Sequence, residues 1–139
     1  MPDRDLRADA HKLQQAALAA VEPAAGVRRH VHREEDMLIV AGRGYDLRDY
    51  ERVFVIGGGK AAVPMAATIA DILGELLTEG TVVTKYGHTI SQSPISNLQI
   101  LEAGHPVPDE NSIRGAQAIA DLARRATERD LVICLISGG

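Results

Sequence analysis

The stretch that decides the fold is VFVIGGGKAA, residues 53–62. Its first four residues form a continuous apolar strand pattern, which runs directly into Gly57, Gly58, Gly59 and Lys60. In α/β proteins a strand that enters glycines and then a helix is typical of an anion site, because backbone N–H groups and the helix N-terminus turn toward the ligand. The three glycines are therefore candidate phosphate- or carboxylate-binding residues, and Lys60 adds a full positive charge.

Two interpretations of this loop stay open. Three glycines after a strand also allow a tight turn and close helix packing, and Lys60 could be a solvated lysine at a helix start. A cation in the first helical turn interacts unfavourably with the helix macrodipole. The position of Lys60 therefore favours the interpretation in which an anion binds nearby. The loop is not a Walker A motif, since Phe54 stands where that motif has a glycine and Ala61 where it has Ser or Thr.

From residue 52 onward, apolar strands alternate with helical patterns. The predicted strands cover residues 53–56, 81–84, 98–103 and 131–136. One helix face is marked by Ala62, Ala66, Ile69, Leu73 and Leu76, and a turn follows at residues 78–80. Asp109 is a good N-cap for a second helix, which carries Ile113, Ala116, Ala120, Ala123 and Ala126. Strands without polar alternation indicate a parallel sheet covered on both faces, an α/β fold of three layers.

The N-terminal part follows a different pattern. Apolar positions recur at helical spacing from Asp3 to about Val21, and Pro23 with Gly26 ends this helix. Residues 28–35 are charged and irregular. Residues 37–40 and 44–47 then predict a small hairpin.

Four loops follow the four predicted strands. In a parallel sheet, ligands bind outside the carboxyl ends of the strands, so these loops are expected to open on one edge. The loops bring glycines, two lysines, two histidines and a serine to this edge, a set that suits a small carboxylate or phosphate. Besides the glycine loop and Lys60, the candidate binding residues are Lys85, His105, Ser137, Gly138 and Gly139, with His88 nearby. Taken singly, Lys85, His88 and His105 are equally compatible with ordinary surface residues.

Composition narrows the function classes. Aromatic residues make up 3% of the chain and the net charge is −4, which counts against a nucleic-acid platform. No apolar run approaches the roughly 20 residues of a membrane span, and no signal-peptide core is present, so a cytoplasmic location is expected. The single cysteine, Cys134, is predicted to be a small core residue. His30 and His32 lack a third ligand, and no metal site is predicted.

Four blocks carry a resemblance to a known family. They are VIGGGKAA (residues 55–62), VVTKYGH (82–88), EAGHPVPD (102–109) and CLISGG (134–139). In this order they resemble the glycerate 2-kinases of bacteria and animals, which carry a C-terminal MOFRL domain and are sometimes labelled hydroxypyruvate reductases. The resemblance spans essentially the whole chain.

This resemblance implies ATP-dependent phosphorylation of D-glycerate at its 2-hydroxyl, with Mg²⁺, in a cleft between a Rossmann-like N-terminal domain and a second domain. The family's glycine-loop lysine falls on Lys60, the candidate catalytic residue, and its serine-glycine loop begins at Ser137. Lys60 would neutralise either the substrate carboxylate or the transferring phosphoryl group. Residues 1–139 are then expected to be an incomplete N-terminal Rossmann-like domain, inactive alone. Pro64 departs from the family pattern and predicts a helix that begins at Pro64.

Two other functions stay open. Gly57, Gly59 and Ala62 match a loose dinucleotide pattern, which would suit an NADPH-dependent hydroxypyruvate reductase. The next strand ends in Thr84-Lys85 rather than in an acid, which disfavours NAD but not NADP. The other hypothesis is that the chain is a non-catalytic remnant, which binds small anions or forms a homodimer through an exposed apolar face.

Overall fold

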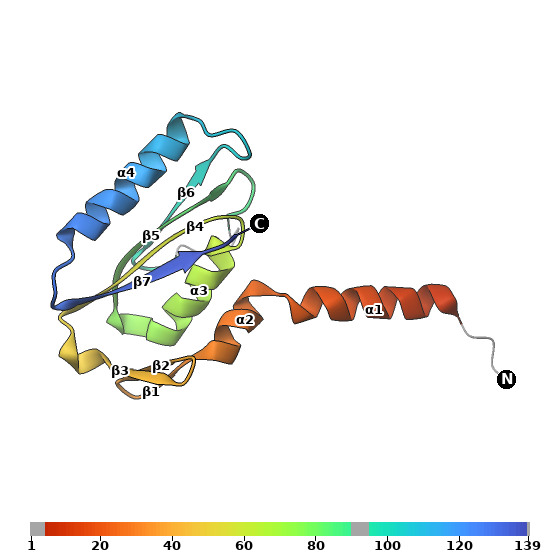
Figure 1. Ribbon diagram of the computed structural model, residues 1–139, viewed down its shortest axis with the longest axis horizontal. Helices are drawn as coiled ribbons and strands as arrows, with labels where there is room; N and C mark the ends of the chain where they lie inside the picture. Colours follow the sequence, from red (N-terminus) through yellow and green to blue (C-terminus); the bar gives the residue numbers. More distant parts are fainter. Residues whose placement is uncertain (1–4, 90–94, 139) are drawn as a thin grey trace.

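The computed structural model describes residues 5–89 and 95–138, and within them a four-stranded, fully parallel sheet forms the centre of the molecule (Figure 1). The strand order is β6-β5-β4-β7. The strands are β4 (Arg52–Gly58), β5 (Leu77–Lys85), β6 (Leu98–Ala103) and β7 (Asp130–Ile136). The chain therefore runs outward from β4 through β5 to β6 and returns to the other side of β4, which creates a topological switch point between β4 and β7.

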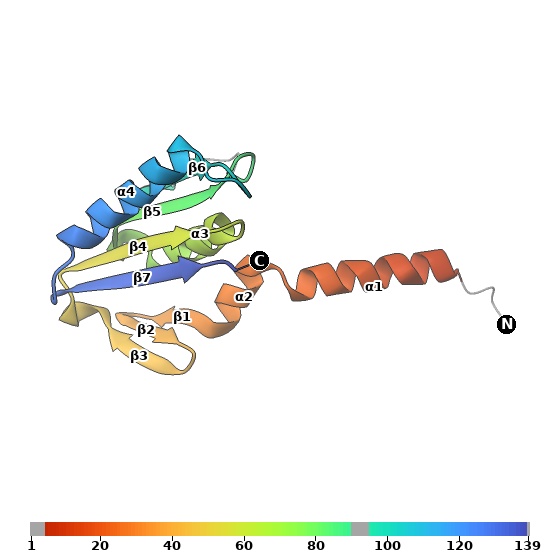
Figure 2. The ribbon, with the colours of Figure 1, turned by 45° about the horizontal axis from the view of Figure 1, so that its top comes forward.

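Two helices cover the opposite faces of this sheet (Figures 1 and 2). Helix α3 (Ala62–Leu73) connects β4 to β5, and helix α4 (Glu110–Arg125) connects β6 to β7. Right-handed crossovers that move in opposite directions along a sheet place their helices on opposite faces. The predicted Rossmann-like three-layer α/β fold is thus confirmed.

The core lies between the sheet and α3. Val53 and Val55 of β4 belong to this core, and Phe54 between them is also buried, as their continuous apolar pattern predicts. The predicted face of α3 is also confirmed, because Ala62, Ala66, Ile69 and Leu73 are all buried. Leu76 does not belong to this face: it lies in the short 3₁₀ turn η2 (Gly74–Leu76) and is 38% exposed.

Helix α4 packs on a face other than the one that its alanines suggest. Ile113 is 72% exposed, whereas Gly115 and Leu122 are buried against the sheet. A Cβ atom at Gly115 would lie 2.7 Å from Cγ2 of Val83 on β5. This glycine is therefore needed for the close approach of α4 to the sheet, which outweighs its low helix propensity.

Two element boundaries differ from the sequence-based expectation. Residues 78–80 are not a turn, because β5 already begins at Leu77. Helix α3 begins at Ala62 rather than at Pro64, with Ala62 N donating to Gly59 O at 3.1 Å and Met65 N to Ala61 O at 3.2 Å. Pro64 is tolerated there because the first turn of a helix needs no N–H donor from that position.

Cys134 is exposed, so its predicted place in the core is wrong. The reason is the position of β7, which has a neighbouring strand on only one side within residues 5–89 and 95–138. Val132 and Ile136 of the same strand are also exposed. An apolar run alone does not distinguish a central strand from such an edge strand.

The N-terminal part forms two helices and a second sheet. Helix α1 (Leu6–Ala20) extends away from the body and has no buried residue (Figures 1 and 2). The structured elements that follow are α2 (Pro23–His30), β1 (Val31–Glu34), β2 (Met37–Val40), β3 (Arg43–Asp46) and the 3₁₀ turn η1 (Leu47–Asp49). The predicted hairpin is confirmed as β2 and β3, but β1 extends it to an antiparallel order β1-β2-β3.

Pro23 both follows α1 and occupies the first turn of α2, where the Glu22 carboxylate accepts hydrogen bonds from Ala24 N and Ala25 N. Residues 28–35, expected to be irregular because of their charged composition, instead form the last turn of α2 and the strand β1. None of the helices in residues 5–89 and 95–138 combines the length and apolar character needed to cross a bilayer.

An ion pair ties the first residues of β4 and β7 together. Arg52 Nε donates to Asp130 Oδ1 at 2.9 Å and Arg52 Nη2 to Asp130 Oδ2 at 2.8 Å. The Asp130 side chain is fully covered and also accepts from Thr127 N at 2.8 Å. These hydrogen bonds, that of Arg52 foremost, hold the pKa of Asp130 well below its usual range.

We expect Asp130→Asn to lower the thermal unfolding midpoint at pH 7. Because folding lowers the pKa, the carboxylate stabilises the chain above the unfolded pKa of about 3.9, and this contribution is lost as the pH falls toward the folded pKa. The difference between wild type and variant should therefore narrow from pH 5 to pH 2, as followed by circular dichroism. Asp121→Asn, on the exposed face of α4, is the control and should change the midpoint less. A difference that stays constant with pH would contradict this role for Asp130.

Candidate functional site

The glycine loop leaves the sheet at the carboxyl end of β4 and turns sharply. Gly59 has a φ of +115°, a conformation that residues with a side chain rarely adopt, and its N–H donates to Val83 O at 3.0 Å. Gly57 is buried within the sheet, where a Cβ atom would lie 2.7 Å from Leu135 O. At Gly57 and Gly59, glycine is thus required by close approach to β7 and by the turn.

Ser137, the first residue after β7, binds this loop directly. Its N–H donates to Gly58 O at 3.1 Å, and its Oγ accepts from Ala61 N at 3.2 Å. The carboxyl ends of β4 and β7 are therefore locked together at the start of α3. Gly138 follows Ser137 and has open space around its Cα, and Gly139 lies outside the described residues.

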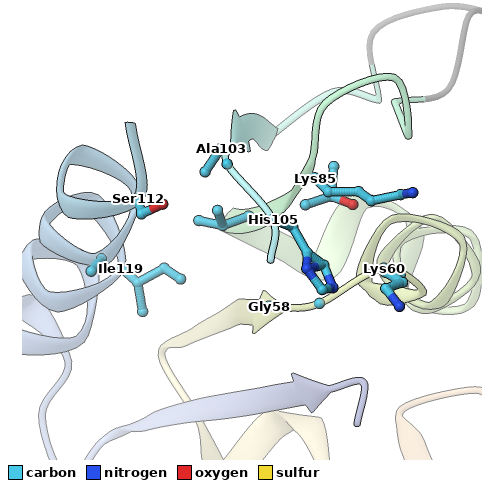
Figure 3. Close-up of a pocket in the computed structure, with 12 residues that line it drawn as sticks. Gly58, Lys60, Lys85, Ala103, His105, Ser112 and Ile119 are labelled. Atoms are coloured by element: carbon cyan, nitrogen blue, oxygen red, sulfur yellow. The ribbon is translucent and has the colours of Figure 1, made fainter. Parts of the chain in front are cut away.

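A cleft of about 310 Å³ opens beside the glycine loop. Its walls come from the carboxyl ends of β4, β5 and β6, from the loops after β4 and β6, and from α4, as Figure 3 shows with Ser112 and Ile119 across from Lys60. The carboxyl ends of β4, β5 and β6 thus meet around one cleft, as expected, whereas the residues after β7 do not line it. The lining residues are Gly58, Gly59, Lys60, Val83, Thr84, Lys85, Ala103, Gly104, His105, Ser112, Ala116 and Ile119.

The cleft is rich in groups that attract anions. Lys60 and Lys85 are two of the three lysines in the sequence, and both line it together with His105. The Lys60 and His105 side chains are exposed, and Lys85 is half-buried. Among the described residues that line the cleft none is a carboxylate. This arrangement suits a carboxylate or phosphoryl group but supplies no carboxylate ligand for Mg²⁺, the protein ligand that this ion prefers.

The other candidates lie outside the cleft. Gly57 is buried beneath it, Ser137 and Gly138 lie behind the glycine loop, and His88 is not a lining residue. Thr84 and Ser112, by contrast, line the cleft and were missed as candidates. Thr84 precedes Lys85 in the block VVTKYGH, residues 82–88. Nothing in the sequence distinguishes a strand threonine that lines a site from one that only packs in the sheet.

Asp109 organises the loop that carries His105. Its carboxylate accepts from the Tyr86 hydroxyl at 2.6 Å, from Gly104 N at 3.1 Å and from Ser112 N at 3.0 Å. The hydrogen bond from Tyr86 contributes most to holding the pKa of Asp109 well below its usual range, and the same bond raises the pKa of Tyr86. The predicted N-cap is confirmed, and it also joins the loops after β5 and β6.

Residues 9–139 match a family described as a domain of unknown function, DUF4147. The chain belongs to the DUF4147 family. It is 39% identical over 97% of its length to a protein of Pyrococcus horikoshii named glycerate 2-kinase, of which it covers 29%. The predicted resemblance to glycerate 2-kinases is thus confirmed.

Two crystal structures resemble this DUF4147 chain. A protein from Pyrococcus horikoshii OT3 superimposes with a TM-score of 0.81 at 39% identity, over 100% of this chain and 30% of that protein. A glycerate kinase from Thermotoga maritima gives a TM-score of 0.72 at 34% identity, over 96% of this chain and 28% of that protein. The chain therefore spans less than a third of the length of these relatives.

We expect Gly59→Ala to destabilise the DUF4147 chain by about 1–3 kcal/mol, the usual cost of a strained backbone conformation. A Cβ atom there would collide with the Ser137 backbone oxygen and approach Ser137 Cβ to 2.8 Å. Gly58→Ala is the matched control: its nearest neighbour would be Val83 O at 4.0 Å, and its free energy of unfolding should stay within about 0.5 kcal/mol of wild type. Urea unfolding measures both, and equal effects would show that the turn does not depend on Gly59.

Proposed function

We propose that this chain forms the anion-binding part of a glycerate 2-kinase, which transfers the γ-phosphoryl group of ATP to the 2-hydroxyl of D-glycerate. The observation that carries the proposal is the cleft at the glycine loop, where Lys60, Lys85 and His105 gather without a carboxylate. The 39% identity to a protein named glycerate 2-kinase, over 97% of this chain, supports the choice of substrate. Because the chain covers 29% of that relative, the activity is proposed for a protein that includes the remaining length.

The proposed phosphoryl transfer brings several negative charges together, so the site must above all neutralise charge. The 2-hydroxyl oxygen forms a bond to the γ-phosphorus, the bond from that phosphorus to the bridging oxygen of ADP breaks, and the hydroxyl proton is released. Phosphoryl transfer depends on positioning and on stabilising charge at the transferring group. Lys60, at the start of α3, would neutralise either the glycerate carboxylate or the phosphoryl oxygens.

ATP and Mg²⁺ remain part of this proposal as the co-substrate and the metal. The residues that line the cleft fit an anionic group, but they do not fit a metal ion, since the described lining contains no carboxylate. No step is therefore assigned to Mg²⁺ on this chain. A location in the cytoplasm accords with the proposed small-molecule substrate.

Lys60→Ala is expected to lower kcat/KM for D-glycerate at least about tenfold, since about 1.4 kcal/mol of transition-state stabilisation corresponds to that factor. The assay follows ATP-dependent formation of 2-phosphoglycerate by the longest protein that the gene encodes. Lys12→Ala is the control, because Lys12 lies on the projecting helix α1. Kinetics of Lys60→Ala near those of wild type would reduce Lys60 to a solvated residue at the helix start.

The same preparation tests the alternative of an NADPH-dependent reductase. We expect calorimetry to detect ATP binding and no binding of NADPH, and hydroxypyruvate to cause no oxidation of NADPH. Binding of NADPH without binding of ATP would overturn the kinase proposal. Binding of small anions without turnover of either substrate would favour a non-catalytic role.

A further inference from the structure

Tyr86 links two of the chain segments that form the cleft. It directly follows Lys85, which is the last residue of β5 and lines the cleft, but Tyr86 is not itself a lining residue. The Tyr86 hydroxyl donates to Asp109 Oδ2 at 2.6 Å and accepts from Asn111 Nδ2 at 2.8 Å. Both partners lie at the start of α4, immediately after the loop of His105. The Tyr86 side chain therefore joins the end of β5 to the beginning of α4.

The Asp109 carboxylate continues this connection to the residue before His105. Its Oδ1 accepts from Gly104 N at 3.1 Å, while its Oδ2 accepts from the Tyr86 hydroxyl. Hydrogen bonds to one carboxylate thus connect the neighbour of Lys85 with the neighbour of His105. Because Lys85 and His105 both line the cleft (Figure 3), the connection ties together two of its basic groups.

The two oxygens of Asp109 have different tasks. Oδ1 also accepts from Ser112 N at 3.0 Å, which is the hydrogen bond that caps α4. Oδ2 accepts from the Tyr86 hydroxyl, which is not part of that cap. Loss of the Tyr86 hydroxyl therefore leaves the cap of α4 in place and removes the connection between β5 and the loop of His105.

Core packing does not account for Tyr86. Its side chain is 50% exposed, whereas Tyr45 packs against the hydrophobic core. Helix α4 is already held on the sheet by the close approach at Gly115 and by buried Leu122. The Tyr86 hydroxyl is accounted for by what it joins, the two segments that carry Lys85 and His105.

We propose that Tyr86 is a positioning residue of the anion site: through Asp109, its hydroxyl holds Lys85 and His105 at the spacing at which both meet one carboxylate or phosphoryl group. This inference rests on the proposed function of the same cleft. Groups that are fixed before a ligand arrives lose less conformational freedom when it binds, so such preorganisation increases affinity. In this role Tyr86 acts through its neighbours and does not touch the substrate.

The test titrates D-glycerate and inorganic phosphate, separately, into the longest protein that the gene encodes. Tyr86→Phe keeps the ring and removes the hydroxyl, and it should weaken binding of at least one of these anions about fivefold, the effect of losing one hydrogen bond. Tyr45→Phe is the matched control, since Tyr45 lies on β3 in the other sheet, and it should leave both affinities within about twofold of wild type. Loss confined to D-glycerate assigns the two basic groups to the carboxylate, and loss confined to phosphate assigns them to the phosphoryl group.

A double-mutant cycle tests whether Tyr86 acts through Asp109. Asp109→Asn keeps one side-chain oxygen for the cap of α4 and replaces the acceptor of the Tyr86 hydroxyl by an amide N–H group. If the two residues act as a unit, Tyr86→Phe should weaken anion binding by less than about twofold in the Asp109→Asn background. An equal loss in both backgrounds would contradict the proposal, because Tyr86 would then act independently of Asp109.

Kinetics separate this role from a merely structural one. Tyr86→Phe should raise the KM of the substrate whose anion it binds more weakly, while kcat stays within about threefold of wild type. Circular dichroism measures the folded fraction of the same samples. A loss of activity that only follows a loss of folded protein, with KM unchanged, would show that Tyr86 is structural and would overturn the proposal.

The outcomes also distinguish this inference from the proposed function. If Tyr86→Phe binds both anions as wild type does, or if wild type binds neither, the role of Tyr86 is overturned. If wild type fails to phosphorylate D-glycerate while Tyr86→Phe still weakens phosphate binding, the kinase proposal fails and the role of Tyr86 stands.

Discussion

The close contact between the glycine loop and the end of β7 is the constraint on which the site depends. Ser137 donates to Gly58 O and accepts from Ala61 N, and Gly59 turns through a φ of +115° beside it. These contacts leave no room for a Cβ atom at Gly59. They fix both the direction in which α3 leaves the sheet and the position of Lys60. The glycines at 57 and 59 thus serve packing directly, and any ligand role they have builds on that packing.

A second close approach shapes the opposite wall. Gly115 lets α4 lie against Val83 of β5, which brings Ser112 and Ile119 to the cleft opposite the glycine loop. Asp109 caps the same helix and holds the loop of His105 through Gly104. The cleft is therefore formed by strand ends and a helix whose spacing is set by glycines and by one capping carboxylate. That carboxylate is occupied by hydrogen bonds to neighbouring residues, which leaves the cations of the cleft to attract an anion.

The sequence predicts the sheet, α3 and the shared edge of the loops well, because these follow from apolar periodicity and from the rule for parallel strands. It fails where burial depends on neighbours distant in the chain. Cys134 has the same apolar context as a central strand residue but lies in a strand with one neighbour among the described residues. The alanines of α4 suggest a packed face, yet the close approach at Gly115 rotates another face inward. Charge conceals β1, which pairs with β2 despite one apolar residue in four.

The candidate site, too, depends on contacts between residues distant in the chain, which the sequence alone does not predict. Lysines and glycines at strand ends are conspicuous in a sequence, and the structure places Lys60, Lys85 and His105 around one cleft. A threonine inside a strand is not conspicuous, since β-branched residues are common there for reasons of packing. Only the three-dimensional arrangement shows that the Thr84 oxygen is buried without a partner among residues 5–89 and 95–138, while the Thr68 hydroxyl has a backbone partner. An unpaired buried donor stabilises neither the strand nor the core. Its burial therefore costs the folded state free energy that the surrounding apolar packing offsets.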